Sequence, residues 1–225
     1  MSETNPAVQS SGAAVSDSTV SMISAVSVDT FNNAVYNAGV LMHDVDISSA
    51  TDAASLLTLI TNSENRAKWF GATQGGVNIQ ENRTYWTPDI DGLRLPFKGQ
   101  NQVDTAEPKM TGTLVEITPE NVKAVSGAAD KTTDNSKPNI TTVQPRASIK
   151  EGDYYGTVMF VGNQGSDGLF VCIMQNALCT SGINSQTGDK AVGTLPFEFT
   201  AHSASPTFTD TLPIKYLFFK KASSS

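Results

Sequence analysis

Residues 77–86 alternate regularly between two faces, and both faces are largely polar. One face carries Val77, Ile79, Glu81, Arg83 and Tyr85, and the other carries Asn78, Gln80, Asn82, Thr84 and Trp86. A period of two predicts a β-strand. Burying this strand inside one monomer would leave several charged and amide groups desolvated. We therefore expect it at a sheet edge, on a solvated wall or at a contact between subunits.

Glycines that are typical of turns lie on both sides of this strand. Gly75 and Gly76, in the run Gly71-Ala72-Thr73-Gln74-Gly75-Gly76-Val77, predict a tight turn that leads into it. After it, Asp91-Gly92 supplies a turn position with positive φ. The alternating apolar residues Leu93, Leu95 and Phe97 then predict a returning strand, which would complete a β-hairpin.

The rest of the pattern predicts a mainly β protein. Strands are expected over 154–161, 169–174, 195–201 and 214–219, and an extended segment with a break at Gly39 over 31–45. Helical spacing of Ala53, Leu56, Leu57 and Ile60 behind Thr51 or Asp52 predicts a short helix. Thr118-Pro119-Glu120 predicts the start of a second helix, over 119–125. The fold class expected is a β-sandwich or β-barrel with one or two short flanking helices.

Composition divides the chain into an arm and one domain. Residues 1–30 are rich in Ser, Ala, Thr and Val without a sustained period, which predicts an extended N-terminal arm that is flexible or ordered only by a partner. Residues 31–225 are expected to form a single β-rich domain. Within it, the polar segment 126–150 reads as a long loop.

The acidic charge is regional. The formal net charge is −7, and residues 1–65 contain seven acidic side chains and no Lys or Arg. The rest of the chain carries 15 acidic and 15 basic side chains, which cancel. Duplex binding through phosphates requires clustered Lys and Arg, so this balance argues against a protein that grips DNA. The balance is still compatible with a protein that contacts DNA without binding it tightly.

The N-terminus and the cysteines bear on the compartment. No basic region followed by an apolar stretch begins the chain, so we expect no export by a signal peptide, and no membrane association. On one straight strand, Cys172 and Cys179 would lie on opposite faces about 23 Å apart, too far for a disulfide. Two reduced thiols fit a reducing cytoplasm.

Templates for catalysis fit poorly. His43-Asp44-Val45-Asp46 is the one cluster that resembles a metal site, but a strand would direct His43 away from Asp44, so a solvated acidic turn is favoured. No serine-nucleophile elbow accompanies His43 or His202. Gly71–Gly76 lacks the Lys-Ser/Thr ending of a phosphate loop. We expect no enzyme, no catalytic residues, no metal and no cofactor.

Several segments in order resemble the major tail proteins, or tail tube proteins, of long-tailed bacteriophages that infect Gram-positive bacteria. The resemblance rests on these runs: Gly71-Ala72-Thr73-Gln74-Gly75-Gly76-Val77, Asp91-Gly92, Lys98-Gly99, Thr111-Gly112-Thr113-Leu114, Ile117-Thr118-Pro119-Glu120-Asn121, and Leu195-Pro196-Phe197-Glu198-Phe199-Thr200-Ala201-His202. It covers roughly residues 35 to 220, and the order and spacing of the runs carry it. The N-terminal arm and the segment 126–150 are less typical of the family.

The resemblance implies a structural virion protein, made and assembled in the host cytoplasm, that forms stacked hexameric rings. Inner sheets of neighbouring subunits would join into a tube whose lumen conducts the genome into the host without binding it specifically. Other tail proteins (tape measure, terminator and distal tail protein) would be its partners, and residues 1–30 would order against the adjacent ring. The assembly interface expected comprises Asn37, Gly39, Val40, Gly75, Gly76, Val77, Ile79, Glu81, Arg83, Tyr85, Asp91 and Gly92.

Two other classes remain open on the sequence. A carbohydrate- or receptor-binding β-sandwich would use Tyr85, Trp86 or Trp69 as stacking platforms. A hydrolase would depend on His43 or His202. Within the tail-tube interpretation, contractile and non-contractile tails are not distinguished, nor is the face that lines the lumen.

Overall fold

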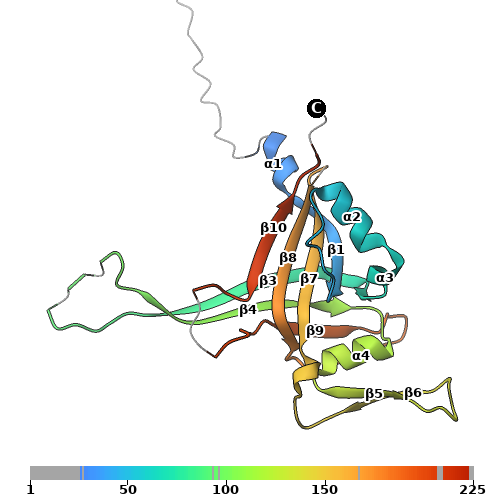
Figure 1. The fold of residues 1–225 in the computed structure, drawn as a ribbon. Helices are drawn as coiled ribbons and strands as arrows, with labels where there is room; N and C mark the ends of the chain where they lie inside the picture. The colour runs from blue at the N-terminus through green and yellow to red at the C-terminus, as the bar shows by residue number, and fades with distance from the viewer. Residues whose placement is uncertain are drawn as a thin grey trace, which may run out of the picture.

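The computed structural model describes residues 26, 28–92, 94–95, 97–166, 168–206 and 210–222. The helices are α1 (Val28–Asn33), α2 (Ala53–Thr61), α3 (Ser63–Arg66) and α4 (Pro119–Ser126), with a 3₁₀ turn at Glu151–Asp153. The strands are β1 (Val35–His43), β2 (Trp69–Gly71), β3 (Thr73–Trp86), β4 (Gln102–Leu114), β5 (Ala129–Thr133), β6 (Thr141–Pro145), β7 (Tyr155–Gln164), β8 (Gly168–Cys179), β9 (Leu195–Thr200) and β10 (Ile214–Phe219). The protein is mainly β, as the sequence pattern predicts (Figure 1).

Eight strands form one antiparallel sheet that folds into two layers. Its order is β2-β1-β7-β8-β9-β4-β3, with β10 paired to β8. The first layer contains β2, β1, β7, β8 and β10, and β9, β4 and β3 cross it at a steep angle (Figure 1). Strand β8 joins the layers, because it pairs with β7 and β10 along most of its length and with β9 at Leu178 and Cys179.

A local bend lets β8 change layers. Asn176 has a positive φ of 47°, between the part of β8 that pairs with β10 and the part that pairs with β9. Strands that pass from one sheet to another do so at bulges or bends. The bend also corrects the expectation for the cysteines. Cys172 and Cys179 are free and buried in the same core, because the irregularity at Asn176 shifts the alternation by one residue.

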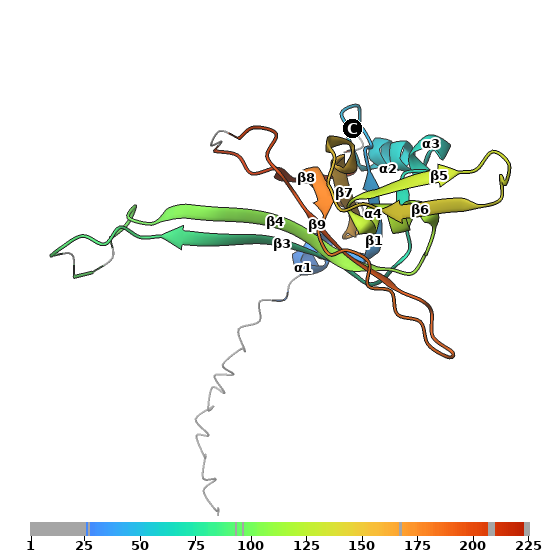
Figure 2. The same cartoon turned by 90° about the horizontal axis from the view of Figure 1, so that it is seen from below.

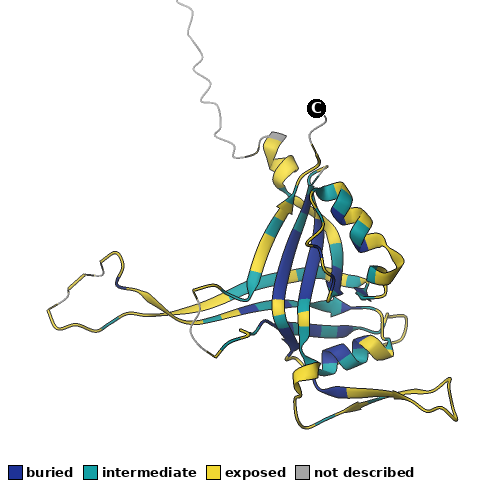
Figure 3. Ribbon diagram, in the orientation of Figure 1, coloured by how far each residue is buried: buried dark blue, intermediate teal, exposed yellow. Residues whose placement is uncertain are grey.

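Two cores lie on opposite faces of the first layer. The inner core, between the layers, is closed at one end by α4; its buried members are Leu41, Phe70, Met110, Leu114, Ala124, Val125, Val158, Phe160, Cys172, Met174, Ala177, Cys179, Leu195, Phe197, Phe199 and Ala201. The outer core lies under α2; its buried members are Met42, Val45, Ile47, Leu56, Ile60, Met159, Val161, Leu169, Val171 and Ile173. The apolar face predicted for 195–201 is therefore confirmed as core (Figure 3).

Both helices predicted from capping signals are present. Asp52 caps α2 by accepting a hydrogen bond from the Ser55 N–H at 2.7 Å. Thr118 caps α4 by accepting from the Asn121 N–H at 3.2 Å, with Pro119 as the first helical residue. Asn121 then ties α4 to the sheet, because its buried amide donates to the Phe70 carbonyl at 2.9 Å. A helix with a long-range anchor of this kind holds the end of the inner core closed.

The predicted N-terminal arm is only partly covered by the structure. Residues 1–25 and 27 lie outside the described residues. At 28–33 the expectation of an extended chain is wrong, because these residues form α1. Asp29 in its first turn complements the helix dipole, and the Ala34 N–H closes its last turn on the Thr30 carbonyl at 3.0 Å.

The hairpin prediction over 77–97 is right about the first strand and wrong about its partner. β3 pairs with β4, from Trp86 opposite Gln102 to Thr73 opposite Leu114, and the described residues between 87 and 101 form the connection. Pro88 lacks an N–H for ladder pairing, which favours leaving the strand there. Gln100 organises the connection, since its buried amide donates to the Pro88 carbonyl and accepts from the Phe97 N–H, both at 3.2 Å.

The segment 126–150 is not the long loop that its polarity predicts. β5 and β6 form a separate antiparallel hairpin within it, beside α4 (Figure 2). Arg146 anchors its base, because the side chain is 14% exposed and contacts Asp153 at 2.5 Å and Asp130 at 3.0 Å. Short strands with polar side chains on both faces give no apolar alternation, which explains why the pattern does not reveal them.

We expect this anchor to weaken in acid. Burial alone would raise the pKa of Asp153, but hydrogen bonds from the Lys150 N–H and Arg146, together with the Arg146 charge, hold it below the ordinary 3.8. A lowered pKa in the folded state stabilises the fold above pH 3.8, and this contribution is lost as the pH falls through the folded-state value. Asp153→Asn should lower the free energy of unfolding by about 1–2 kcal/mol at neutral pH, since Arg146 keeps Asp130.

Urea unfolding measured at several pH values checks this expectation. The difference between wild type and Asp153→Asn should shrink as the pH falls below 3.8, the ordinary aspartate pKa. Asp189→Asn, at an exposed position in the loop before β9, is the control and should change stability little. A difference that stays constant with pH would contradict the role of the Asp153 charge.

Candidate assembly surface

The exposed edge of β3 is the main candidate surface. The strand spans 14 residues and ends the sheet order, and among the described strands only β4 pairs with it. Its other edge therefore presents backbone N–H and C=O groups without a strand partner. Long free edges invite pairing with another chain. Of the three placements that the sequence leaves open for this strand, the sheet edge is therefore the one that the structure shows.

Gly75 and Gly76 lie inside this strand and not in a turn before it. Between the pairs Thr73–Leu114 and Val77–Gly112, β3 advances four residues while β4 advances two. The extra residues form a bulge, and both glycines have positive φ, 78° and 80°. No atom lies within 4 Å of the position a Cβ would take on either glycine. Backbone conformation, and not space, requires glycine there.

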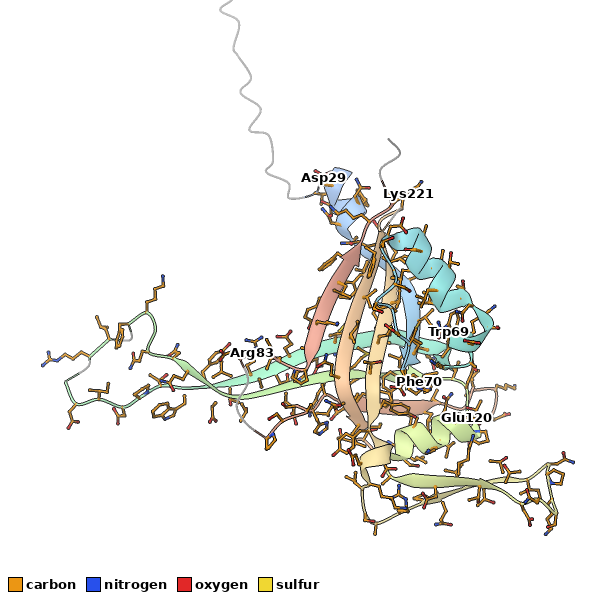
Figure 4. The ribbon with its side chains drawn as sticks, in the orientation of Figure 1. Asp29, Trp69, Phe70, Arg83, Glu120 and Lys221 are labelled. Atoms are coloured by element: carbon orange, nitrogen blue, oxygen red, sulfur yellow. The ribbon has the colours of Figure 1, made fainter. Side chains whose placement is uncertain are left out.

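The face of β3 that points toward the first layer changes character along the strand. Val77 and Ile79 pack against the inner core. Farther out, Arg83 Nη2 lies 2.7 Å from Glu81 Oε2, and hydrogen bonds from Arg83 and from Tyr216 of β10 lower the pKa of Glu81. Figure 4 shows Arg83 where the strand leaves the body of the protein.

The opposite face of the β3, β4 and β9 layer is polar; we call it the polar face. It carries Asn78, Gln80, Asn82, Thr84, Thr105, Glu107, Lys109, Thr111, Thr113 and Glu198. Its one basic member, Lys109, is held between Glu107 and Glu198, with Nζ to carboxylate distances of 3.0 and 3.2 Å. Hydrogen bonds to these two carboxylates raise the pKa of Lys109. The face thus presents no unneutralised cation among its members.

Strands β3 and β4 continue past the body as a two-stranded arm. β9 pairs with β4 only from Lys109 onward, so residues 81–86 and 102–108 extend without a third described strand (Figures 1 and 2). Large apolar side chains are exposed toward its end; we call them the arm tip: Tyr85, Trp86, Ile90, Leu95, Phe97 and Val103. Leu95 and Phe97 were expected in a returning strand, and they lie in the connection instead; Leu93, expected in the same strand, lies outside the described residues.

The remaining predicted interface residues do not join β3 in one patch. Asn37 and Gly39 have positive φ in β1, at the expected break, where its register with β7 shifts. A Cβ on Gly39 would lie 2.4 Å from Phe160 Cε2, so packing within the chain explains this glycine. Val40 packs against the outer core. Asp91 and Gly92 form an exposed turn in the connection, where Gly92 has a φ of 87°.

The three aromatic residues proposed as saccharide platforms do not lie on one face. Tyr85 and Trp86 are consecutive in a strand, so they point to opposite faces of the arm. Trp69 is partly buried against the outer core, with the Arg66 guanidinium 5.3 Å from its ring centroid. Figure 4 shows Trp69 and Phe70 against the body, far from the arm.

The two histidines contact neighbouring side chains within the chain, and the two cysteines are buried. His43 Nδ1 lies 3.2 Å from Asp44 Oδ2, which corrects the expectation that they diverge; Asp44 has a φ of 49° and ends the strand. The His202 ring packs on Tyr154, with centroids 5.2 Å apart. Burial raises the pKa of the Cys172 thiol to about 12, so it stays protonated. Among the described residues, no group of three or more His, Cys, Asp or Glu could hold a metal ion.

Comparisons with known proteins give no family for the chain. A scan against models of protein families finds no match, and a search of curated proteins finds none either. Within the part of the chain that the structure describes, no helix is long and apolar enough to cross a membrane.

Proposed function

We propose that this protein is a structural subunit that polymerises into a tube, as the major tail proteins of long-tailed phages do, and that phage DNA passes through the tube. The observation that carries the proposal is the 14-residue edge strand β3 with its bulge, continued by an arm with an apolar tip. Pairing of the β3 edge with a neighbouring copy would satisfy its backbone groups and extend the sheet from subunit to subunit.

The polar face is the surface that best suits a water-filled lumen. Its hydroxyl and amide groups tolerate water, and its one lysine is neutralised by two carboxylates. Each unneutralised cation in a DNA channel would act as a brake by binding phosphate. Closing the sheet into a barrel with this face inward would place the inner core, the outer core and α2 outside the channel.

Negative-stain microscopy of the purified protein, with and without tail-initiating partners, tests the proposal. Hollow tubes of constant diameter, built from stacked rings, are the expected result. A protein that stays monomeric under all assembly conditions would contradict it. A glycan array serves as a second readout, because selective saccharide binding would favour the carbohydrate-binding alternative.

Gly76→Val should impair ring assembly more than folding. Valine is β-branched and strongly disfavours the φ of 80° at this position, so the bulge and the direction of the free edge should change. The local strain is about 1–3 kcal/mol, which the monomer should tolerate because the site is open. Gly182→Val, with a φ of 65° and an equally open site in a loop, is the control for strain alone. Tubes of normal yield and length from Gly76→Val would contradict the role of the bulge.

Replacing Glu107 and Glu198 together by Gln should make assembled tubes retain DNA. The change frees Lys109 on the polar face, and each added phosphate contact steepens the salt dependence of binding by about 0.9 in log–log slope. Filter retention of duplex DNA at several salt concentrations measures this. Glu120→Gln frees Lys131, its partner at 2.7 Å beside α4, and should have no such effect. Equal retention by both variants would show that the polar face does not line the channel.

A further inference from the structure

A second exposed apolar surface lies far from the arm, on the first layer. Strands β7, β8 and β10 extend beyond the crossing of β3 and β4 toward α1 (Figure 1), which leaves part of their inner side uncovered. Val35, Phe170, Tyr216 and Phe218 form this surface, which we call the aromatic face. The Phe170 ring lies 5.4 Å from Phe218 and 6.1 Å from Tyr216, and the latter pair is stacked.

The side chains of the aromatic face contact one another but stay exposed to solvent. Phe218 is 60% exposed, Val35 47% and Tyr216 39%. An open groove of about 680 Å³ continues the face between α1 and the end of β10, with Asn33 and Lys220 on its walls. Contiguous exposed apolar patches often mark interaction sites, whereas single exposed apolar residues do not.

The arm tip is the matching surface on the same chain. Its members are 46–78% exposed, with Leu95 the most exposed. The unsupported part of the arm is about six residue pairs long and therefore reaches roughly 20 Å from the body. A two-stranded ribbon is marginally stable in water by itself. The arm therefore needs a partner surface to hold it.

We propose that the arm tip of one copy docks on the aromatic face of the next copy. The two surfaces cannot meet within one chain, because the arm projects away from the first layer (Figures 1 and 2). Contact between different surfaces of identical chains is heterologous and produces rings or filaments. The docking rests on the proposed function and names the surfaces that would connect subunits in addition to the β3 edge.

The arm tip supplies part of the area that a stable contact buries. Aromatic side chains bury about 150–250 Å² each. Because Tyr85 and Trp86 point to opposite faces of the arm, one contact takes one of them together with Phe97 and the aliphatic side chains on that side. These side chains supply part of the roughly 800 Å² per partner that stable interfaces bury, and pairing of the β3 edge would add to it. The charged residues in the connection, Asp89, Asp91, Arg94 and Lys98, balance one another, so no net charge opposes docking.

Two complementary variants test the docking. The arm variant carries Trp86→Ser and Phe97→Ser, and the face variant carries Val35→Ser and Phe218→Ser. The arm variant keeps the aromatic face and the face variant keeps the arm tip. A variant by itself therefore lacks one of the two surfaces and should not associate through this contact. Mixed in equal amounts, they should form dimers with one copy of each variant, at twice the monomer mass. Native mass spectrometry with one variant isotopically labelled identifies the composition of the dimer.

The controls separate docking from folding and from the proposed function. All four side chains are exposed, so unfolding midpoints should match wild type, and Val192→Ser, at a 68% exposed residue in a loop, should leave association unchanged. A mixture with no more dimer than either variant alone overturns the docking. Tubes from wild type with no mixed dimer would refute the docking and leave the proposed function standing. Mixed dimers, together with a wild type that forms no tubes, would support the docking and refute the proposed function.

Discussion

Phe199→Ala should lower the free energy of unfolding by about 3–5 kcal/mol, the usual range for removing a buried aromatic ring. Phe199 is fully buried in β9, and its ring centroid lies 5.3 Å from Phe70, 5.5 Å from Phe197 and 6.1 Å from Tyr155. These neighbours come from three strands in two layers, so they cannot collapse together into the cavity. Domains of this size are stable by roughly 5–15 kcal/mol, so the loss would be a large share.

Urea unfolding under conditions that keep the protein monomeric measures the effect, with circular dichroism as the signal. The midpoint should fall while the slope with denaturant stays unchanged, because the surface exposed on unfolding is nearly the same. Phe31→Ala is the matched control, since Phe31 in α1 is 62% exposed and should change stability by less than about 0.5 kcal/mol. Equal effects of the two substitutions would contradict the inner core described above.

The features that sequence patterns predict here are those set by near neighbours in the chain. The alternation of Leu195, Phe197 and Phe199 identifies a core strand, because each strand residue faces the same layer as the residue two positions away. The caps Asp52 and Thr118 identify helix starts because the hydrogen bond closes within three residues. Local chemistry is sufficient in these cases.

The features that sequence patterns miss depend on contacts distant in the chain. Asp91-Gly92 is a good turn signal, yet β3 pairs with β4 beyond it because the longer ladder and β9 support that register. The side on which Cys179 lies depends on one residue with positive φ, Asn176.

The candidate surfaces follow the same division. The polarity of β3 predicts an edge, and the structure has it at the end of the sheet order. The neutralisation of Lys109 requires Glu198 from β9, some 90 residues away, so no local pattern reveals it. The arm tip is assembled from both strands and their connection, and Leu95 and Phe97 in it resemble core residues when only their alternation is considered. Exposure of apolar residues is a property of the whole fold.

Gly127→Ala should lower the free energy of unfolding by about 2–5 kcal/mol, although it adds a single methyl group. Gly127 follows α4 with a φ of 71°, and its N–H donates to the Ala124 carbonyl at 3.3 Å. A Cβ there would lie 2.3 Å from the Cys179 carbonyl oxygen, which belongs to the backbone of β8. Strain from positive φ costs about 1–2 kcal/mol, and displacing a backbone in a packed core adds about 1–3 kcal/mol. The end of β8, which pairs with β9, would have to move.

Gly182→Ala separates these two costs. Its φ of 65° imposes similar strain, but no atom lies within 4 Å of the position of its Cβ. We expect it to cost about 1 kcal/mol, so the difference between the two variants measures the close approach of α4 to β8. Thermal and urea unfolding of both variants provide the comparison. Hydrogen exchange should also show faster opening of Leu178 and Cys179, the β8 residues that pair with β9, in Gly127→Ala alone. Equal destabilisation by the two variants would mean that the α4 end is not pressed against β8, and α4 would then not be what closes the inner core.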